Sequence, residues 1–167
     1  MGVLETSHGG SIMDDRPGTL DNNSTEAIAP VSFMLKRAAQ LSADLFADQL
    51  GKTGLTQRQY TVLETVLSNE GASQTDLVRT TGIDRSTLAD LVNRLETQGY
   101  VRRERSPTDA RVNFVFLTPL GRETVIKAKP IAAVVDMTLV NLVSPKLRKS
   151  FIASLEELSS KLDESNG

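Results

Sequence analysis

Apolar residues recur at spacings of three and four along most of this chain, and that period predicts amphipathic helices. The first run extends from Pro30 to about Leu50, because a proline suits the first position of a helix and Gly51 and Gly54 end the pattern. Residues 1–29 have neither a helical nor a strand period and are rich in Gly, Ser, Asn, Asp and Thr. We therefore expect a flexible N-terminal tail followed by a first helix.

Helix-start signals divide the next stretch into shorter helices. A Ser or Thr with a Gln or Asp three residues later forms a capping box, and an Asp alone caps a further helix. In chain order these signals are Thr56 with Gln59, Ser73 with Asp76, and Asp84. Gly82 separates the second of these helices from the third, and Gly99 ends the third.

The period changes to two beyond Gly99. An alternation of side chains over residues 112–117 predicts a strand, and residues 100–105 are its expected hairpin partner. The tip between them is Ser-Pro-Thr-Asp, and the hairpin carries Arg102, Arg103, Arg105 and Arg111. A helix, a tight turn, a second helix and a basic hairpin follow one another in the order of a winged helix-turn-helix.

Two further helices are expected after the hairpin. Thr118-Pro119 begins a long one, which ends before Ser144-Pro145, where the last one starts. Their apolar surface exceeds what a small winged helix can cover, so they must pack on the first helix or on a second subunit. The fold class is mainly α with a small β-hairpin wing, a winged helix-turn-helix flanked by dimerisation helices. The expected divisions are a tail (1–29), a dimerisation helix (30–54), a DNA-binding domain (55–118) and C-terminal dimerisation helices (119–167).

Composition narrows the chemistry further. The 167 residues include no cysteine and one histidine, His8, which excludes disulfides, thiolate metal sites and a Ser-His-Asp set. We therefore expect no metal, no cofactor and no enzymatic activity. No apolar run approaches the roughly 20 residues that span a bilayer, and no signal sequence is recognisable at the N-terminus. A cytoplasmic protein without membrane contact is expected.

The net charge of −2 is unevenly distributed along the chain. Residues 1–29 hold one basic residue against five acidic ones, whereas residues 102–111 hold four arginines against Glu104 and Asp109. Because affinity for a DNA duplex depends on neutralising phosphates, this local basic region fits a DNA-binding surface, and a dimer would double it.

The predicted motif presents small polar and basic side chains in the first turn of its second helix, which suits the major groove, and arginines on its hairpin, which suit phosphates or the minor groove. Candidate DNA-binding residues are Ser73, Thr75, Arg85, Ser86, Thr87, Asp90, Arg94, Arg105, Asp109 and Arg111. Asp109 is expected to pair with Arg111 and hold its guanidinium toward the groove. A plainer interpretation of the polar residues in the helix turn is that they are only solvated. The hairpin arginines could likewise only keep an exposed edge strand soluble and unpaired. The alternative function is a winged-helix module for protein interaction or assembly.

These segments also resemble a known family. Residues 55–66 resemble the second helix of the multiple antibiotic resistance regulator (MarR) family of bacterial transcription factors, and residues 83–103 resemble its recognition helix and first wing strand. Asp109-Ala110-Arg111 matches the Asp-x-Arg of its wing, and residues 117–122 its strand-to-helix junction. The resemblance covers about residues 31–163. It implies an obligate homodimer, binding to a short palindrome of double-stranded DNA, and commonly release by a small aromatic or acidic ligand.

Two further features concern the base specificity of the protein and the ligand to which it would respond. Asp90 stands where many members of that family have a basic residue, and a carboxylate there accepts from cytosine N4 but repels phosphate. An organic ligand is the signal that remains within the family, and its expected site lies between the first two helices and the start of the fifth. The candidate ligand-binding residues are Phe33, Lys36, Arg37, Phe46, Arg58 and Tyr60. The aromatic residues in this set are also typical of a core, so both interpretations stay open.

Overall fold

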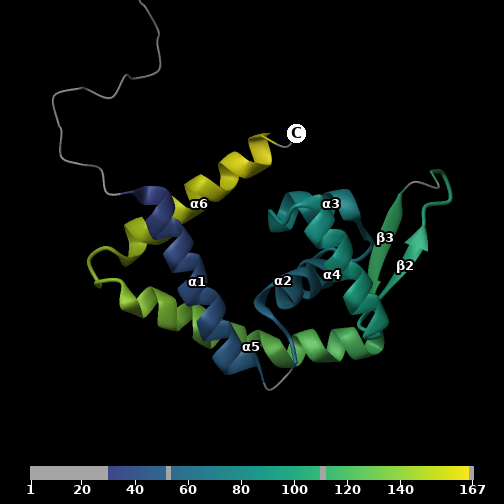
Figure 1. Cartoon of the computed structure of the whole chain (residues 1–167), viewed down its shortest axis with the longest axis horizontal. Coiled ribbons are helices and arrows are strands. Elements are labelled where there is room, and N and C mark those ends of the chain that lie inside the picture. Colours follow the sequence, from purple (N-terminus) through teal and green to yellow (C-terminus); the bar gives the residue numbers. More distant parts are fainter. Residues whose placement is uncertain (1–29, 52–53, 110–111, 166–167) are drawn as a thin grey trace, which may run out of the picture.

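The computed structural model describes residues 30–51, 54–109 and 112–165 of the chain. Within these ranges helices dominate, and three short strands form one sheet (Figure 1). In chain order the elements are α1 (Val31–Leu50), α2 (Gln57–Ser68), β1 (Ala72–Ser73), α3 (Gln74–Thr81), α4 (Arg85–Thr97), β2 (Val101–Arg105), β3 (Asn113–Leu117), α5 (Pro119–Leu142) and α6 (Arg148–Ser165). The fold class expected from the sequence is confirmed.

Side-chain caps fix where the short helices begin. The Thr56 hydroxyl accepts from the backbone N–H of Gln59 at 3.3 Å, and the Gln59 side chain accepts from the backbone N–H of Thr56 at 2.9 Å. Ser73 and Asp76 repeat this reciprocal arrangement at the start of α3, at 3.1 and 3.0 Å. Each box satisfies backbone donors that the first turn of a helix leaves without partners.

The sheet is antiparallel, with strand order β1-β3-β2. β3 is the central strand, because Val115 lies opposite Arg103 of β2 on one side and Ala72 of β1 on the other. The hairpin of β2 and β3 was expected, whereas β1 was not. A strand of two residues has no period to detect, and its position depends on pairing with a strand far along the chain.

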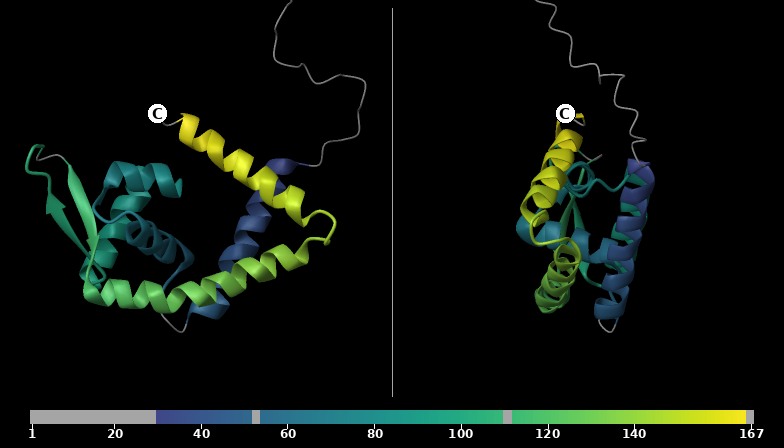
Figure 2. Two further views of the ribbon diagram at one scale, coloured as in Figure 1. Left: turned by 180° about the vertical axis from the view of Figure 1, so that it is seen from behind. Right: turned by 90° about the vertical axis from the view of Figure 1, so that its left-hand side faces the viewer.

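One core holds the winged-helix elements together and includes the C-terminal end of α1 and the buried side of α5 as far as Val135. Its buried residues include Phe46, Leu50, Leu63, Leu77, Leu88, Leu95, Val115, Val125 and Val135. The N-terminal half of α1 and the second half of α5 after Pro130 lie on the other side of the molecule, and α6 starts there and runs back toward α3 (Figure 1). We call these three segments the arm. α6 doubles back from the end of α5 and rises away from it (Figure 2).

A close backbone approach joins the hairpin to α5. A Cβ on Gly121 would lie 1.9 Å from the carbonyl oxygen of Tyr100, so a residue without a side chain is required here. The Thr118 hydroxyl donates to the carbonyl oxygen of Gly99 at 2.6 Å and accepts from the N–H of Gly121 at 3.0 Å. The base of the hairpin is therefore fixed directly on the first turn of α5.

The start of the last helix differs from the prediction. α6 begins at Arg148 rather than at Ser144-Pro145, and residues 145–147 form a turn. The guanidinium of Arg148 donates to the carbonyl oxygens of Val143 and Asn141, at 2.9 and 3.3 Å. These bonds satisfy acceptors at the end of α5, and the turn brings Arg148 back to them. The expected tail, residues 1–29, lies outside the described residues.

None of the helices in the described ranges is both long enough and apolar enough to cross a membrane.

Candidate nucleic-acid interface

The N-terminal turn of α4 is held by Asp84. Its carboxylate accepts from the backbone N–H of Thr87 at 2.9 Å and from the Ser86 hydroxyl at 2.7 Å. Hydrogen bonds from Thr87 and then Ser86 hold the pKa of Asp84 well below its usual range. Because the Ser86 proton points back to Asp84, its hydroxyl offers lone pairs to an incoming partner.

The exposed side of α4 is polar. Leu88, Val92 and Leu95 are buried on the inner side. The outer side carries exposed Ser86, Asp90, Asn93 and Thr97, at spacings of four, three and four. On a helix this spacing places the four residues in one stripe.

A small hollow of about 120 Å³ lies on one flank of α4, and we call it the α3–α4 hollow. It brings together the candidate residues Ser73, Thr75 and Arg85, which come from β1, α3 and α4. Its full lining is Ser73, Gln74, Thr75, Val78, Arg85, Leu88, Val112 and Asn113. Thr75 and Arg85 are exposed, whereas the Ser73 hydroxyl donates to Asp76 at 2.7 Å. Arg85 makes no ion pair with any described residue, so its charge is available to an anion.

A larger hollow of about 840 Å³ lies on the opposite flank, and we call it the α1–α4 hollow. Small residues of α1 form one wall, the start of α2 forms another, and α4 contributes Thr87, Asp90, Leu91 and Arg94. Asp44 and Arg58 supply further charges. Candidate DNA-binding residues and one candidate ligand-binding residue, Arg58, therefore border the same space.

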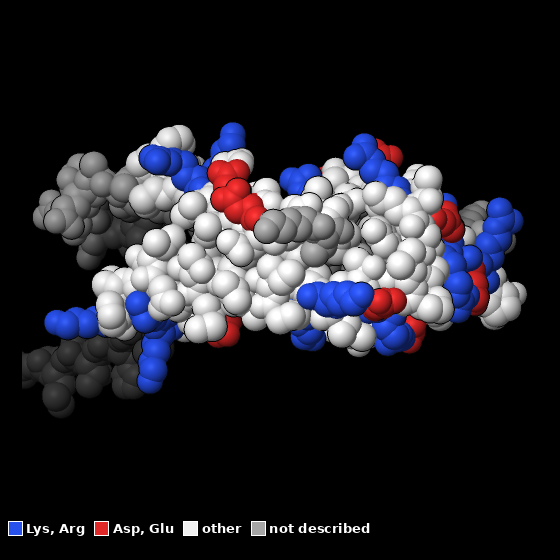
Figure 3. All heavy atoms as spheres, turned by 90° about the horizontal axis from the view of Figure 1, so that it is seen from below, with Lys and Arg blue, Asp and Glu red and all other residues white. Residues whose placement is uncertain are grey.

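The wing arginines on β2 differ in their partners. Arg102 stacks over the Phe116 ring at 4.6 Å and pairs with Glu104. Arg103 donates to Glu96 of α4, with its Nε at 2.9 Å from Oε2, and the pKa of Glu96 is lowered by these hydrogen bonds. Arg105 is exposed and makes no ion pair with any described residue. Seen from below, blue and red side chains mix at the hairpin end, whereas the face along α5 is largely uncharged (Figure 3).

The wing tip is described in part. Asp109 is exposed, and its backbone N–H donates to the Ser106 hydroxyl at 3.3 Å. Its carbonyl oxygen accepts from the N–H of Val112 at 3.0 Å, which closes the turn. Arg111, and with it the expected pair between Asp109 and Arg111, lies outside the described residues.

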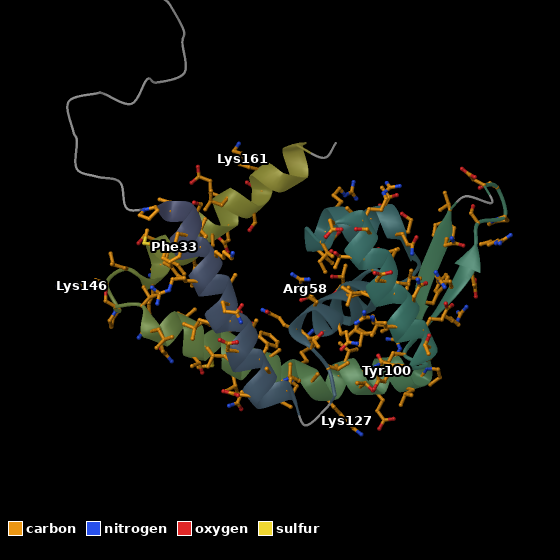
Figure 4. All side chains as sticks on the ribbon, viewed as in Figure 1. Phe33, Arg58, Tyr100, Lys127, Lys146 and Lys161 are labelled. Carbon is orange, nitrogen blue, oxygen red and sulfur yellow. The ribbon has the colours of Figure 1, made fainter. Side chains whose placement is uncertain are left out.

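The candidate ligand-binding residues do not lie together within one chain. Phe33 and Phe46 are 13 positions apart on α1, which at about 1.5 Å per residue separates them by roughly 20 Å. Arg37 stacks over Phe33 at 5.8 Å on the exposed N-terminal half of α1, where Lys36 also lies. Figure 4 shows Phe33 far from Arg58.

Phe46 and Tyr60 belong to the core region instead. Their ring centroids are 5.9 Å apart, Phe46 is buried and Tyr60 is half-buried. Burial, and then the carboxylates of Glu64 and Asp136, raise the pKa of Tyr60. The phenol therefore stays protonated at neutral pH, and the pair serves first as packing between α1 and α2.

Sequence reasoning missed the contacts that connect α4 to its surroundings. Gln59 is 7% exposed and donates from Nε2 to Oε1 of Gln98, just beyond the C-terminal end of α4, at 3.2 Å. Glu96 holds Arg103 of the wing. These partners are distant in sequence or on different elements, so no local spacing identifies them.

The helix-turn-helix with its hairpin, the polar outer side of α4 and the unpaired arginines define a winged-helix DNA-binding protein. Residues 53–112 match the family model described as the MarR family. The transcriptional regulator HosA of Escherichia coli is 32% identical over 104 residues, which cover 62% of this chain and 77% of HosA. The chain belongs to the MarR family and is a DNA-binding transcriptional regulator.

Solved structures agree with this assignment. BpsR of Bordetella bronchiseptica, whose DNA binding is regulated by 6-hydroxynicotinic acid, has a TM-score of 0.73 and 27% identity. The match covers 78% of this chain and 99% of BpsR. The transcriptional repressor CouR, bound to a 23-mer DNA duplex, has a TM-score of 0.69 and 30% identity, with 77% of this chain and 92% of CouR covered.

Proposed function

We propose that this regulator acts in the cytoplasm as a homodimeric repressor rather than as an enzyme, binds a pseudo-palindromic operator, and leaves it when a small organic acid binds. The observation that carries the proposal is the contrast between unpaired arginines around α4 and an arm whose apolar side chains face outward. Repression is supported by the likeness to CouR, which is named a repressor.

The arm supports dimerisation. None of the described side chains of α6 is buried, although several of them are large and apolar. Apolar side chains also face outward on α1 and on the second half of α5. The most exposed apolar side chains of the arm and of the turn between α5 and α6 are Phe33, Val134, Met137, Leu142, Leu147 and Leu158, each between 53% and 65% exposed. An apolar surface of this extent is typical of an interface, and a second copy of the same arm covers it by two-fold symmetry.

The dimer would place two copies of α4 on one side of a duplex. Two-fold related recognition helices enter successive major grooves about 34 Å apart, so the operator mirrors the symmetry of the protein. Ser86 and Thr87 are proposed to meet base edges, and Arg85 and Arg94 to meet phosphates on either flank. Thr75 and Ser73 would line the seat of one phosphate beside Arg85, and Arg105 and Arg111 would carry the wing contacts.

The ligand is proposed to occupy the α1–α4 hollow. Arg58 would pair with the carboxylate of a small aromatic acid, and Ala43, Ala47 and Leu55 would cover its ring. Such a ligand would touch the flank of α4 that carries Arg94, so it would compete with DNA for the same helix. BpsR, whose DNA binding responds to 6-hydroxynicotinic acid, supports this class of ligand.

Footprinting tests the proposal, with the purified full chain on the DNA upstream of its own gene. We expect protection of two half-sites one helical turn apart, release by a subset of aromatic acids, and loss of that release in Arg58→Ala. Protection of a single half-site would contradict the dimer. Release that persists in Arg58→Ala at unchanged ligand concentration would remove Arg58 as the anchor.

If the chain is instead a protein-interaction module, its affinity for a DNA duplex should not fall steeply as the salt concentration rises. A DNA-binding surface loses affinity steeply as salt rises, because bound phosphates release their counterions. Measuring affinity for a random duplex between low and physiological salt separates the two functions.

A further inference from the structure

The recognition helix and its cap carry three carboxylates, Asp84, Asp90 and Glu96, and the chain uses them differently. Asp84 caps the helix, and Glu96 holds Arg103. The Asp90 carboxylate makes no hydrogen bond and no ion pair with any described residue. Arg58 and Arg94 border the same hollow as Asp90, yet neither reaches ion-pair distance. Asp90 is therefore the uncompensated negative charge of this helix.

Asp90 also lies at the centre of the exposed side of α4. It belongs to the stripe of Ser86, Asp90, Asn93 and Thr97, opposite the buried leucines. Arg85 lines the hollow on one flank of this stripe, and Arg94 lines the hollow on the other. A helix in the major groove directs its central stripe at base edges and its flanks at the two phosphate backbones.

The chemistry of the base edges restricts what Asp90 accepts. A carboxylate at neutral pH only accepts hydrogen bonds, so the acceptor atoms of guanine and thymine repel it. The amino group of adenine is a donor, but the acceptor N7 stands beside it. Cytosine presents its N4 amino group with an acceptor on one side only, the O6 of the paired guanine, whereas adenine N6 lies between its own N7 and the O4 of the paired thymine. Cytosine is therefore the base that suits Asp90.

We propose that Asp90 is a specificity-determining residue, which selects a cytosine in each half-site and weakens binding to all other DNA. This inference rests on the proposed placement of α4 in the major groove. The unpaired charge is unfavourable beside phosphates at every sequence, and a cytosine amino group offsets that cost only at the correct site. Discrimination thus comes from repulsion as well as from attraction.

The test uses the full chain and the variant Asp90→Asn, which keeps the shape of the side chain and removes its charge. Glu157→Gln is the matched control, because it removes the same charge from an exposed position on α6. Each protein selects duplexes from a randomised library, and the retained DNA is sequenced. We expect the wild type and the control to enrich the same cytosine at symmetric positions. Asp90→Asn should instead favour adenine there, because an amide pairs with adenine N6 and N7 together.

Affinity measurements complete the test. Replacing the selected cytosine pair should weaken the wild type by about ten-fold for each half-site and weaken Asp90→Asn little. Affinity for a random duplex should rise in Asp90→Asn and stay unchanged in Glu157→Gln. The inference would be overturned if the wild type and Asp90→Asn selected identical bases. It would also be overturned if Asp90→Asn gained affinity equally for operator and for random DNA. If the wild type retained no common sequence, the proposed reading of DNA by α4 would fail as well.

Discussion

The region around α4 and the arm differ in the kind of side chain that is left without a partner. Around α4, most acids and bases are paired with near neighbours, and those without an ion pair among the described residues include Arg58, Arg85, Asp90, Arg94 and Arg105. In the arm, the large apolar side chains of α6 stay exposed, with Leu155 at 40% and Leu158 at 56%. Within one chain, most charges of the first region have partners, whereas the large apolar side chains of the second region remain uncovered.

This difference separates what folding needs from what binding needs. Caps, ion pairs and the Gly121 contact hold the hairpin and α4 in a fixed relation before any DNA arrives, so binding does not have to order them. The exposed apolar side chains of the arm stay in contact with water until another surface covers them. A partner for the first region is therefore an anion, and a partner for the second is apolar.

The largest expected effect is on assembly. Leu155→Asp places a charge in the exposed apolar stripe of α6, where burial on association would leave it unpaired. We expect this variant to lose the dimer, by a factor of hundreds or more in the dissociation constant, and to lose operator binding with it. Sedimentation velocity measures the change.

Ala153→Asp is the control for Leu155→Asp. It adds the same charge to an exposed residue of α6, two positions away along the helix and on the side away from Leu155. A dimer should persist in this variant. If both variants lost the dimer equally, the loss would reflect helix stability, and the apolar stripe would have no special role.

The next effect is on the fixed base of the hairpin. Gly121→Ala brings a Cβ to 1.9 Å from a backbone oxygen, which no side-chain rotation relieves. We expect the free energy of unfolding to fall by about 3 kcal/mol. Gly51→Ala is the control, because a Cβ there meets nothing within 4 Å and the backbone is helical. Denaturant titration should leave that control within about 0.5 kcal/mol of the wild type, and an equal loss in both variants would contradict the account.

A smaller effect separates the paired from the unpaired arginines of β2. Arg105→Ala should reduce the slope of log affinity against log salt by roughly one for each chain, because a phosphate contact is lost. Arg102→Ala should leave the slope unchanged, since Glu104 already neutralises that guanidinium. Equal slopes for the two variants would show that the pairing does not select which arginine contacts DNA.

The smallest effect concerns the pair of Glu96 and Arg103. The pKa of Glu96 is lowered in the folded chain, so its stabilisation is present above the ordinary carboxylate pKa and is lost as pH falls through the folded value. The difference in unfolding free energy between wild type and Glu96→Gln should therefore be constant near neutral pH and shrink below about pH 4. Both side chains are partly exposed, so the difference should be small. A difference that persisted unchanged at lower pH would exclude this ion pair as its source.

The sequence predicted the features that depend on neighbours along the chain. The capping boxes at Thr56 and Ser73 depend on side chains three residues apart, and the hairpin depends on alternation, so both could be identified. The strand β1 and the pair of Glu96 and Arg103 depend on segments that folding brings together. The start of α6 depends on Arg148 reaching back to the end of α5.

The ligand site shows the same limit. Phe33 and Tyr60 looked compatible with one pocket because both are aromatic and occur on the first two helices. The length of α1 places Phe33 on the arm and Phe46 against Tyr60 in the core. The α1–α4 hollow depends on where α1 ends relative to α4, which no pattern within either helix specifies. Arg58 is the candidate that lines it.

The contrast between the two regions is tested most directly by sedimentation equilibrium of the full chain, alone and with one duplex that contains the selected operator. We predict twice the mass of the single chain at micromolar concentration, and two chains on one duplex. A single-chain mass without DNA, together with one chain on each duplex, would contradict the claim that the arm is completed by a second copy.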